Sequence, residues 1–197
     1  MTFTSAQVFN GQKKGPYSEA DTVDPLNVYG SSQVAAENKV LAINPDALVI
    51  RSSALFGPWD TNNFAVQVLN CLSAQETFYA ADDVLISPTY IPHLVFVSLD
   101  LLIDKERGIW HITNEDALSW KAFAKKIALK GGYDPELVRG VSISSSQQGP
   151  RTPKNAVLTS QKGSFLKTID VALNCFFDEC TVLPASVLKL QRAETLL

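Results

Sequence analysis

The chain has 197 residues, of which 46% are hydrophobic and 19% are charged, and its formal net charge is -3. This composition is typical of a folded globular protein and unlike that of a disordered chain. The small negative charge gives no electrostatic basis for binding nucleic acid or an anionic membrane surface. No apolar run reaches the roughly 20 residues of a membrane-spanning helix, and no basic-then-apolar leader is present, so we expect a cytoplasmic protein.

Residues that commonly bind metals are few and scattered. The cysteines include no C-x-x-C pair, so neither a disulfide framework nor a zinc site is indicated. The two histidines, His93 and His111, have no partner at metal-ligand spacing. We therefore predict no metal site and interpret these side chains as ordinary thiols and structural histidines. The cysteines are Cys71, Cys175 and Cys180.

The first fifty residues read as a strand, a helix and a strand. The alternating, β-branched run from Thr2 to Phe9 predicts a strand. Pro25 and Gly30 punctuate the approach to a helix predicted from Ser31 to Ile43. The continuous apolar run from Ala47 to Ile50 is typical of a strand covered on both faces. This order and length predict a βαβ unit of a parallel sheet.

The remaining chain continues to alternate between strand and helix patterns. The apolar segment 91–103 has helical length but is too short to span a membrane, so we expect a buried helix. Asn62 and Asn63 are good caps for the helix that follows them. The lysines of the helix at 118–129 are expected to be solvated, and residues 183–197 have weak helical character. Strands are predicted at 77–81, 84–87 and 108–113, and helices at 64–73, 91–103, 118–129 and 169–177.

Tyr29 and Gln33 are four residues apart, which places them on one face if the segment is helical. A tyrosine with a lysine at this spacing forms a proton-transfer pair, because a nearby ammonium lowers the pKa of a phenol. Gln33 carries a neutral amide, which can form hydrogen bonds but cannot supply the positive charge.

Several short motifs, taken in order, resemble the dTDP-4-dehydrorhamnose reductase branch of the extended short-chain dehydrogenases. The resemblance covers about residues 2–160, and the ordered agreement of several motifs is more specific than any single motif. The motifs are Thr4-Ser5-Ala6-Gln7-Val8-Phe9-Asn10-Gly11, Pro16-Tyr17-Ser18-Glu19, Pro25-Leu26-Asn27-Val28-Tyr29-Gly30, Asn62-Asn63-Phe64, Ser87-Pro88-Thr89 and the stretch from Arg151 to Asn155.

The resemblance implies an α/β fold with a partial Rossmann-like parallel sheet, the second half of an extended short-chain dehydrogenase, and a small C-terminal substrate-binding subdomain. Residues 1–197 would form a single sugar-nucleotide-binding domain, with residues 178–197 unassigned. In the family, a hydroxyl binds the sugar ketone, a tyrosine donates the proton and a lysine assists the tyrosine. Ser5, Tyr29 and Gln33 occupy these three positions, so Gln33 is the departure.

The same resemblance implies where the ligands lie. Arg51, Ser52 and Ser53 would lie near the nicotinamide end of NADP or NAD. Asn63 and Arg151 would lie near the diphosphate of a nucleotide sugar, since a helix start and a guanidinium both suit phosphate oxygens.

A second departure concerns the dinucleotide site. The family begins with a strand, a glycine-rich turn and a helix that hold the pyrophosphate, and no such turn occurs among the ten glycines of this chain. The family's aspartate and tyrosine after the catalytic hydroxyl are Ala6 and Gln7. We therefore expect that this chain alone does not bind the dinucleotide tightly and that an N-terminal half or a fused domain is a partner.

Three hypotheses follow from these features. The first is an NADP-dependent reductase of a nucleotide-linked 4-keto sugar, slowed by Gln33. The second is a non-catalytic nucleotide-sugar-binding or regulatory module, which the neutral residue 33 and the missing glycine turn favour. The third is a truncated gene product without independent activity, whose first strand is an exposed sheet edge prone to association.

Overall fold

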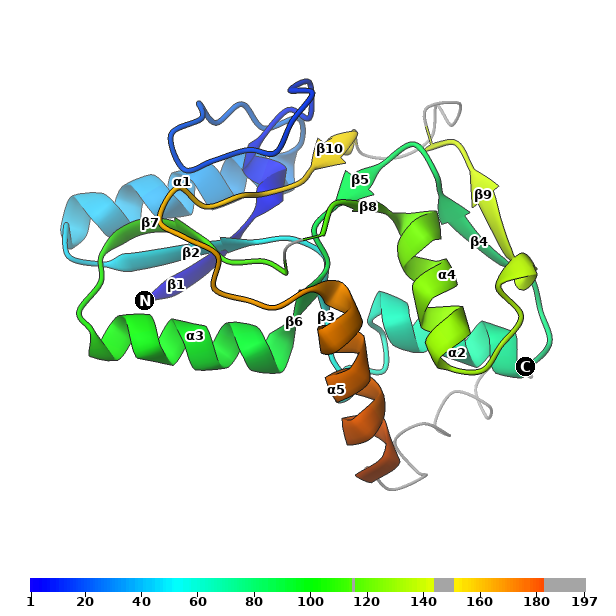
Figure 1. The fold of residues 1–197 in the computed structure, drawn as a ribbon. Coiled ribbons are helices and arrows are strands. Elements are labelled where there is room, and N and C mark those ends of the chain that lie inside the picture. Colours follow the sequence, from blue (N-terminus) through cyan, green and yellow to red (C-terminus); the bar gives the residue numbers. More distant parts are fainter. Residues whose placement is uncertain (115, 144–150, 183–197) are drawn as a thin grey trace, which may run out of the picture.

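The computed structural model describes residues 1–114, 116–143 and 151–182 of an α/β fold (Figure 1). Among these residues the helices are α1 (Val28–Ile43), α2 (Phe64–Ser73), α3 (Ile91–Ile103), α4 (Trp120–Lys130) and α5 (Ile169–Val182), with short 3-10 helices η1 (Ala6–Val8) and η2 (Pro135–Leu137). The strands are β1 (Thr2–Ser5), β2 (Leu48–Ser52), β3 (Leu55–Phe56), β4 (Phe78–Ala81), β5 (Leu85–Ile86), β6 (Thr89–Tyr90), β7 (Gly108–His111), β8 (Leu118–Ser119), β9 (Val138–Val141) and β10 (Asn155–Ala156).

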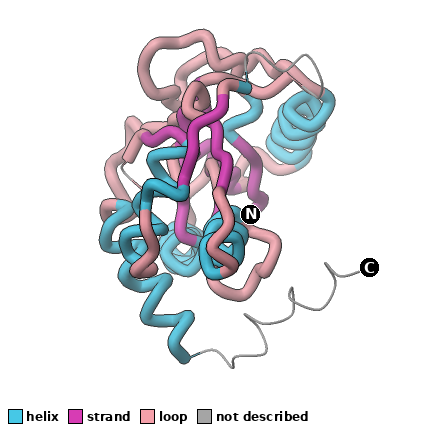
Figure 2. Tube along the Cα trace, turned by 90° about the vertical axis from the view of Figure 1, so that its right-hand side faces the viewer, coloured by secondary structure: helices cyan, strands magenta, loops and turns pink. Residues whose placement is uncertain are grey.

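The main sheet has the order β1-β2-β7, and all its strands are parallel. Thr2 lies opposite Val49, and Val49 lies opposite Ile109. Helix α1 covers one face of this sheet and α3 the other (Figures 1 and 2). All five residues of the central strand β2 are buried, because both of its faces are covered. The predicted βαβ unit and its parallel pairing are thus confirmed.

The second part of the molecule consists of α2, α4 and α5 together with shorter strand pairs. Its core contains three aromatic residues that meet at steep interplanar angles: the ring centroid of Phe56 is 5.2 Å from that of Phe123 and 5.8 Å from that of Phe176. Strand β9 pairs in parallel with β4, and β10 and β8 flank β5. This part follows directly from the carboxyl end of the main sheet, since β3 begins three residues after β2 ends.

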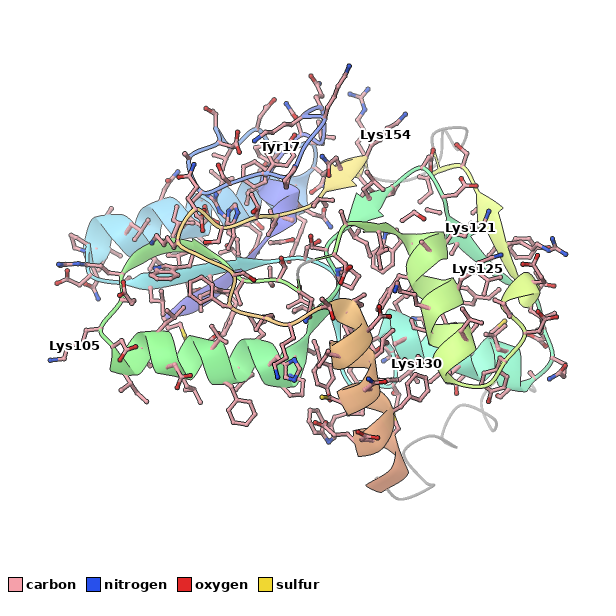
Figure 3. The ribbon with its side chains drawn as sticks, viewed as in Figure 1. Tyr17, Lys105, Lys121, Lys125, Lys130 and Lys154 are labelled. Carbon is pink, nitrogen blue, oxygen red and sulfur yellow. The ribbon has the colours of Figure 1, made fainter. Side chains whose placement is uncertain are left out.

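The α4 lysines Lys121, Lys125 and Lys126 are partly exposed, and Lys121 and Lys125 are labelled in Figure 3. They also form ion pairs that the sequence pattern does not reveal. The Nζ atoms of Lys125 and Lys126 are each 2.8 Å from a carboxylate oxygen, of Glu136 and Asp170 respectively.

Two predicted boundaries at the start of the chain are wrong. The strand predicted from Thr2 to Phe9 ends at Ser5, because the Ser5 hydroxyl accepts a hydrogen bond from the Gln7 N–H and starts the η1 turn. The helix predicted from Ser31 begins at Val28, because the Asn27 side chain caps it by accepting from the Gly30 N–H. Gly30 is therefore inside the first turn rather than before the helix.

Helix α3 has the predicted bounds but is not buried, which is a second correction. One stripe of the helix, Leu94, Ser98 and Leu101, packs on the sheet. The opposite face is exposed although it is apolar, because no element within the described residues covers it. No helix in that part of the chain is long and apolar enough to cross a membrane. The predicted helical character of residues 183–197 lies outside the described residues.

A buried ion pair joins α1 to the main sheet. The Arg51 guanidinium on β2 donates to both carboxylate oxygens of Glu37 on α1, from Nη2 at 2.6 Å and from Nε at 2.9 Å. Both side chains are only 3% exposed. The Thr4 hydroxyl on β1 donates to the same carboxylate at 2.7 Å. Three elements therefore share one set of charge-assisted hydrogen bonds.

We predict that Arg51→Met lowers the free energy of unfolding by about 3–5 kcal/mol, since it leaves the Glu37 carboxylate buried without its charged partner. The matched control is Arg107→Met, because Arg107 pairs with Asp46 where the side chains are 70% and 73% exposed. That change should cost less than about 1 kcal/mol. Urea denaturation of both variants measures the difference, and equal losses would contradict the prediction.

Candidate functional site

The candidate site lies at the carboxyl end of the parallel main sheet, where ligands bind in open α/β sheets. Ser5 is the last residue of β1 and lies directly opposite Ser52, the last residue of β2. The η1 turn follows Ser5 at once, so the chain leaves the sheet at this hydroxyl. The predicted catalytic hydroxyl therefore lies where the fold places ligands.

The first turn of α1 packs directly against the residues that follow Ser5. A Cβ atom added to Gly30 would collide with the carbonyl oxygen of Gln7 and would lie 2.9 Å from the Pro25 Cβ. Only a glycine permits this approach of the two backbones. Tyr29 precedes Gly30, so the close contact fixes the turn that carries the tyrosine next to the end of β1.

Asn27 connects three segments at this place. Its Oδ1 caps α1, and its Nδ2 donates to the Gln7 Oε1 at 2.9 Å and to the Arg151 carbonyl oxygen at 2.8 Å. The C-terminal loop is thereby held at the start of α1, although it is more than a hundred residues away in sequence. Sequence reasoning did not single out Asn27 as a site residue, although its position just before a helix is a capping signal.

Tyr29 and Gln33 both lie within α1, which confirms their spacing on one helical face. The Tyr29 side chain is 53% exposed and Gln33 is partly exposed. The phenol is therefore accessible to solvent.

The three residues expected near the nicotinamide, Arg51, Ser52 and Ser53, are all buried. The Arg51 guanidinium forms the buried ion pair with Glu37, so its role is structural. Ser52 is the last residue of β2 and lies opposite Ser5, and Ser53 follows it. These two serines are therefore nearer to the candidate site than the Arg51 guanidinium is.

The two residues expected near the diphosphate differ in their surroundings. The Asn63 side chain is fully used: Oδ1 accepts from the N–H groups of Ala65 and Val66, and Nδ2 donates to the carbonyl oxygens of Gly57 and Asp60. Arg151 is exposed, and its backbone carbonyl oxygen accepts from Asn27 at the start of α1. Any role of Asn63 toward a phosphate would thus come through the helix start that it caps.

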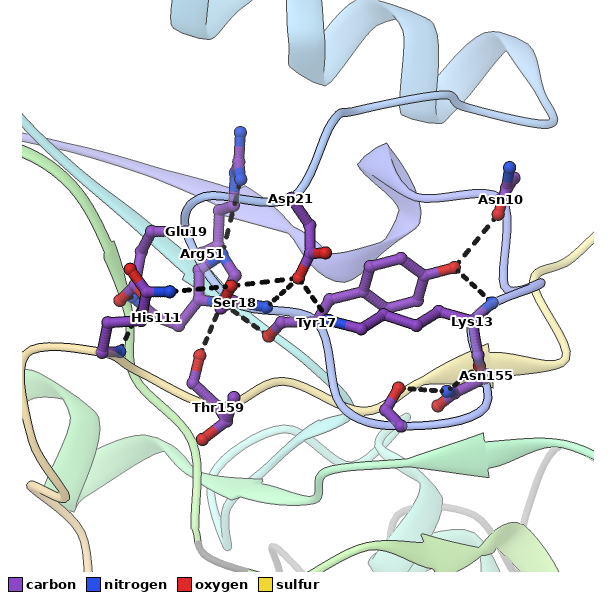
Figure 4. Close-up of polar contacts among 12 residues, drawn as sticks. Asn10, Lys13, Tyr17, Ser18, Glu19, Asp21, Arg51, His111, Asn155 and Thr159 are labelled. Carbon is purple, nitrogen blue, oxygen red and sulfur yellow. Dashed lines mark hydrogen bonds and ion pairs between the residues drawn. The ribbon is translucent and has the colours of Figure 1, made fainter.

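Glu19 and His111 form a polar centre that the sequence did not indicate (Figure 4). Glu19 Oε1 accepts from the His111 N–H at 2.9 Å and from the Ser160 hydroxyl at 2.6 Å, and Oε2 accepts from the Gln161 N–H at 3.0 Å. Burial alone raises the pKa of the Glu19 carboxyl, but these hydrogen bonds outweigh it and leave that pKa below its ordinary value. The carboxylate ties two loops to β7.

The protonation state of His111 follows from its neighbours. Its Nδ1 lies 3.1 Å from the Tyr17 carbonyl oxygen and 3.0 Å from that of Thr159, so Nδ1 carries the proton. Its Nε2 faces Arg51 Nη1 at 3.4 Å and accepts. Burial, reinforced by the Arg51 charge, lowers the pKa of the imidazole. His111 is therefore a neutral structural residue, as predicted from the sequence.

A cavity of about 300 Å³ lies beside this centre, on the β7 side of the sheet. Its walls come from the end of β7 and from the loop 159–165. Neither Ser5 nor Tyr29 lines it. The cavity is thus separate from the candidate catalytic pair.

Comparison with known proteins adds a family match and several relatives. A family model described as the RmlD substrate binding domain matches residues 2–173. The spore coat polysaccharide biosynthesis protein SpsK of Bacillus subtilis is 30% identical over 149 residues, which are 76% of this chain and 51% of that protein. A dTDP-4-dehydrorhamnose reductase of Aggregatibacter actinomycetemcomitans is 30% identical over 166 residues, 79% of this chain and 56% of that protein. The chain spans about half the length of these curated relatives.

Solved structures give the same picture. A dTDP-4-dehydrorhamnose reductase from Clostridium acetobutylicum superposes with a TM-score of 0.85 at 27% identity, over 91% of this chain and 65% of that one. A reductase of the same name from Bacillus anthracis, in complex with NADP, gives 0.84 at 26% identity, over 90% and 64%. The expected fold class is thereby confirmed.

We predict that Gly30→Ala destabilises the protein by about 1–3 kcal/mol, because the added methyl group overpacks the contact with Gln7. Gly15→Ala is the control, since a Cβ there would meet nothing within 4 Å. Thermal unfolding compares the two. An unchanged melting temperature for Gly30→Ala would show that α1 is not held against η1 by this contact.

Proposed function

This chain belongs to the RmlD substrate binding domain family, and on that premise we propose that it is the substrate-binding part of an NADP-dependent reductase acting on a nucleotide-linked 4-keto sugar. Ser5 binds the ketone oxygen, and Tyr29 donates the proton as hydride adds to the carbon. A hydroxyl and a phenol suit this step, because hydride addition develops alkoxide charge that a hydrogen-bond donor stabilises.

The observation that carries the proposal is the contact between the end of β1 and the first turn of α1. Gly30 lies against Gln7, two residues beyond Ser5, and immediately follows Tyr29. This arrangement puts the two proposed catalytic groups on neighbouring segments at the carboxyl end of the sheet. The relatives named as dTDP-4-dehydrorhamnose reductases support the choice of substrate class.

The diphosphate of the nucleotide sugar would be bound by Arg151 and by the start of α2. Arg151 is exposed, its backbone is held at the start of α1 by Asn27, and its guanidinium would bind a diphosphate. The start of α2, which Asn63 caps, offers backbone N–H groups of the kind that bind phosphate. Ser52 and Ser53 would lie toward the nicotinamide of NADP or NAD, the cofactors bound by related structures.

A second candidate function is a non-catalytic nucleotide-sugar-binding or regulatory module. Two sequence features favour it: the neutral Gln33 in the position of the assisting lysine, and the absence of a glycine-rich pyrophosphate turn among the ten glycines. Both functions share the sugar-nucleotide site and differ in whether hydride transfer takes place.

We predict that the chain alone binds dTDP but shows no NADPH binding in the micromolar range, because it lacks the backbone cradle for a pyrophosphate. Isothermal titration calorimetry with each ligand measures this. Arg151→Met should weaken dTDP binding. The control Arg107→Met should not, because Arg107 forms an exposed ion pair with Asp46 and is not one of the proposed binding residues. Micromolar NADPH binding would refute the first part of the prediction, and failure to bind dTDP would refute the proposed substrate class.

A separate prediction concerns Gln33. In a fusion of this chain with the part of the Bacillus anthracis reductase that it lacks, Gln33→Lys should raise reductase turnover roughly tenfold or more, because it supplies the charge that assists the tyrosine. Tyr29→Phe should abolish the activity, and Gln67→Lys on α2 is a control for added charge. If Gln33→Lys left the turnover unchanged, residue 33 would not limit catalysis.

A further inference from the structure

Asn27 forms hydrogen bonds on both sides of the residue that carries the phenol. Its Oδ1 accepts from the Gly30 N–H at 2.8 Å. Its backbone carbonyl oxygen accepts from the Ser31 N–H and from the Ser31 hydroxyl, each at 3.0 Å. Tyr29 lies within this turn, two residues after Asn27. The start of α1, and with it the backbone to which the phenol is attached, is therefore fixed by Asn27.

The orientation of the Asn27 amide follows from its partners. The Gly30 N–H can only donate and the Arg151 carbonyl oxygen can only accept, so Oδ1 faces the first and Nδ2 faces the second. The other hydrogen of Nδ2 is donated to Gln7 Oε1 at 2.9 Å. Aspartate or serine would also cap the helix, but neither has two donors beside the capping oxygen. The two donations, and not the cap, therefore require an amide at this position.

The two donations reach the segments that hold the other proposed site residues. Gln7 lies two residues beyond Ser5, and its N–H donates to the Ser5 hydroxyl oxygen at 3.2 Å. Arg151 has the guanidinium proposed for the diphosphate, and its carbonyl oxygen is 2.8 Å from Asn27 Nδ2. One side chain therefore joins the segments of the ketone-binding hydroxyl, the proton donor and the diphosphate-binding arginine.

The spacing of these segments matters for a nucleotide-linked 4-keto sugar. Its ketone lies across the hexose ring from the carbon that carries the diphosphate, so the ligand itself fixes the separation of the two groups. The protein must hold Arg151 and Tyr29 at a matching separation, because a misplacement of about 1 Å can cost on the order of a hundredfold in rate. The hydrogen bond from Asn27 to the Arg151 backbone constrains this separation directly.

We propose that Asn27 is a positioning residue that holds the diphosphate-binding loop in register with the proton donor Tyr29. It acts through Arg151 and through the first turn of α1, without contacting the reacting atoms. The inference rests on the proposed function, since it gives Asn27 a role at that same site.

Asn27→Asp separates this role from capping, because the carboxylate still accepts from the Gly30 N–H but cannot donate to Arg151. Asn38→Asp is the matched control, since it adds the same charge at an exposed position of the same helix. Both variants should unfold at nearly the wild-type temperature. Isothermal titration calorimetry should show dTDP binding weakened about five- to tenfold in Asn27→Asp, the effect of losing one hydrogen bond that preorganises the site.

Asn27→Ser caps the helix without an amide and without added charge, so it should weaken dTDP binding as Asn27→Asp does. Wild-type affinity in both Asn27 variants would overturn the proposal. So would an equal loss of affinity in Asn38→Asp, because the added charge would then account for the effect.

A double-mutant cycle tests whether Asn27 acts through Arg151. The variant Asn27→Asp/Arg151→Met should bind dTDP no more weakly than Arg151→Met alone, because the guanidinium that Asn27 positions is already absent. Fully additive losses of affinity would show that the two residues act independently and would contradict the proposal.

The link to the proton donor has a readout of its own. In a chain labelled with 3-fluorotyrosine, the fluorine resonance of Tyr29 is the one that disappears in Tyr29→Phe. Saturating dTDP should shift this resonance in the wild-type chain and leave it unshifted in Asn27→Asp. The same shift in both chains would mean that Asn27 does not connect the diphosphate to Tyr29.

Hydrogen exchange of the unliganded chain distinguishes failure of this inference from failure of the proposed function. Asn27→Asp should raise the exchange rate of the backbone N–H groups in residues 151–157, and Asn38→Asp should not. If this change occurred but dTDP bound to no variant, the substrate class would be refuted while Asn27 would still hold the loop. If exchange and dTDP affinity were both unchanged in Asn27→Asp, the positioning role would be refuted and the proposed function would stand.

Discussion

The buried ion pair between Arg51 and Glu37 is the constraint on which the arrangement of the main sheet depends. A charged pair in a dry interior is tolerated only when its hydrogen bonds are satisfied, and here Thr4 supplies a further donor to the carboxylate. The pair fixes α1 in rotation and height over β1 and β2. Tyr29 lies about two turns earlier on the same helix, so the position of the phenol follows from this interaction.

Polar side chains of the loops likewise form hydrogen bonds that join distant parts of the chain. Asn27, Glu19 and Asn155 each satisfy backbone groups of segments distant in sequence. Asn155, for example, donates to the carbonyl oxygens of Lys13 and Gly15, each at 2.8 Å. Since buried backbone groups must be paired, these side chains determine how the long loops lie over the carboxyl end of the sheet. The site is therefore built by loop connections as much as by strands.

The two faces of the main sheet differ in how far they are completed. On one face, α1 covers β1 and β2 and satisfies the buried charges. On the other face, α3 packs on Leu48 and Ile50 of β2 but leaves Phe3 of β1 open. The helix that carries Tyr29 is therefore fixed on the sheet by buried polar contacts, whereas α3 keeps an exposed apolar face.

The sequence by itself determined the βαβ unit, the bounds of α2 and α3, and the family, because hydrophobic periodicity, capping residues and ordered motifs are local signals. It also placed Tyr29 and Gln33 on one helical face. Only the tertiary structure decided that the first strand ends at Ser5, that Gly30 lies against Gln7 and that α3 is half exposed. Each of these depends on which distant segment is the neighbour, and a local pattern carries no information about that choice.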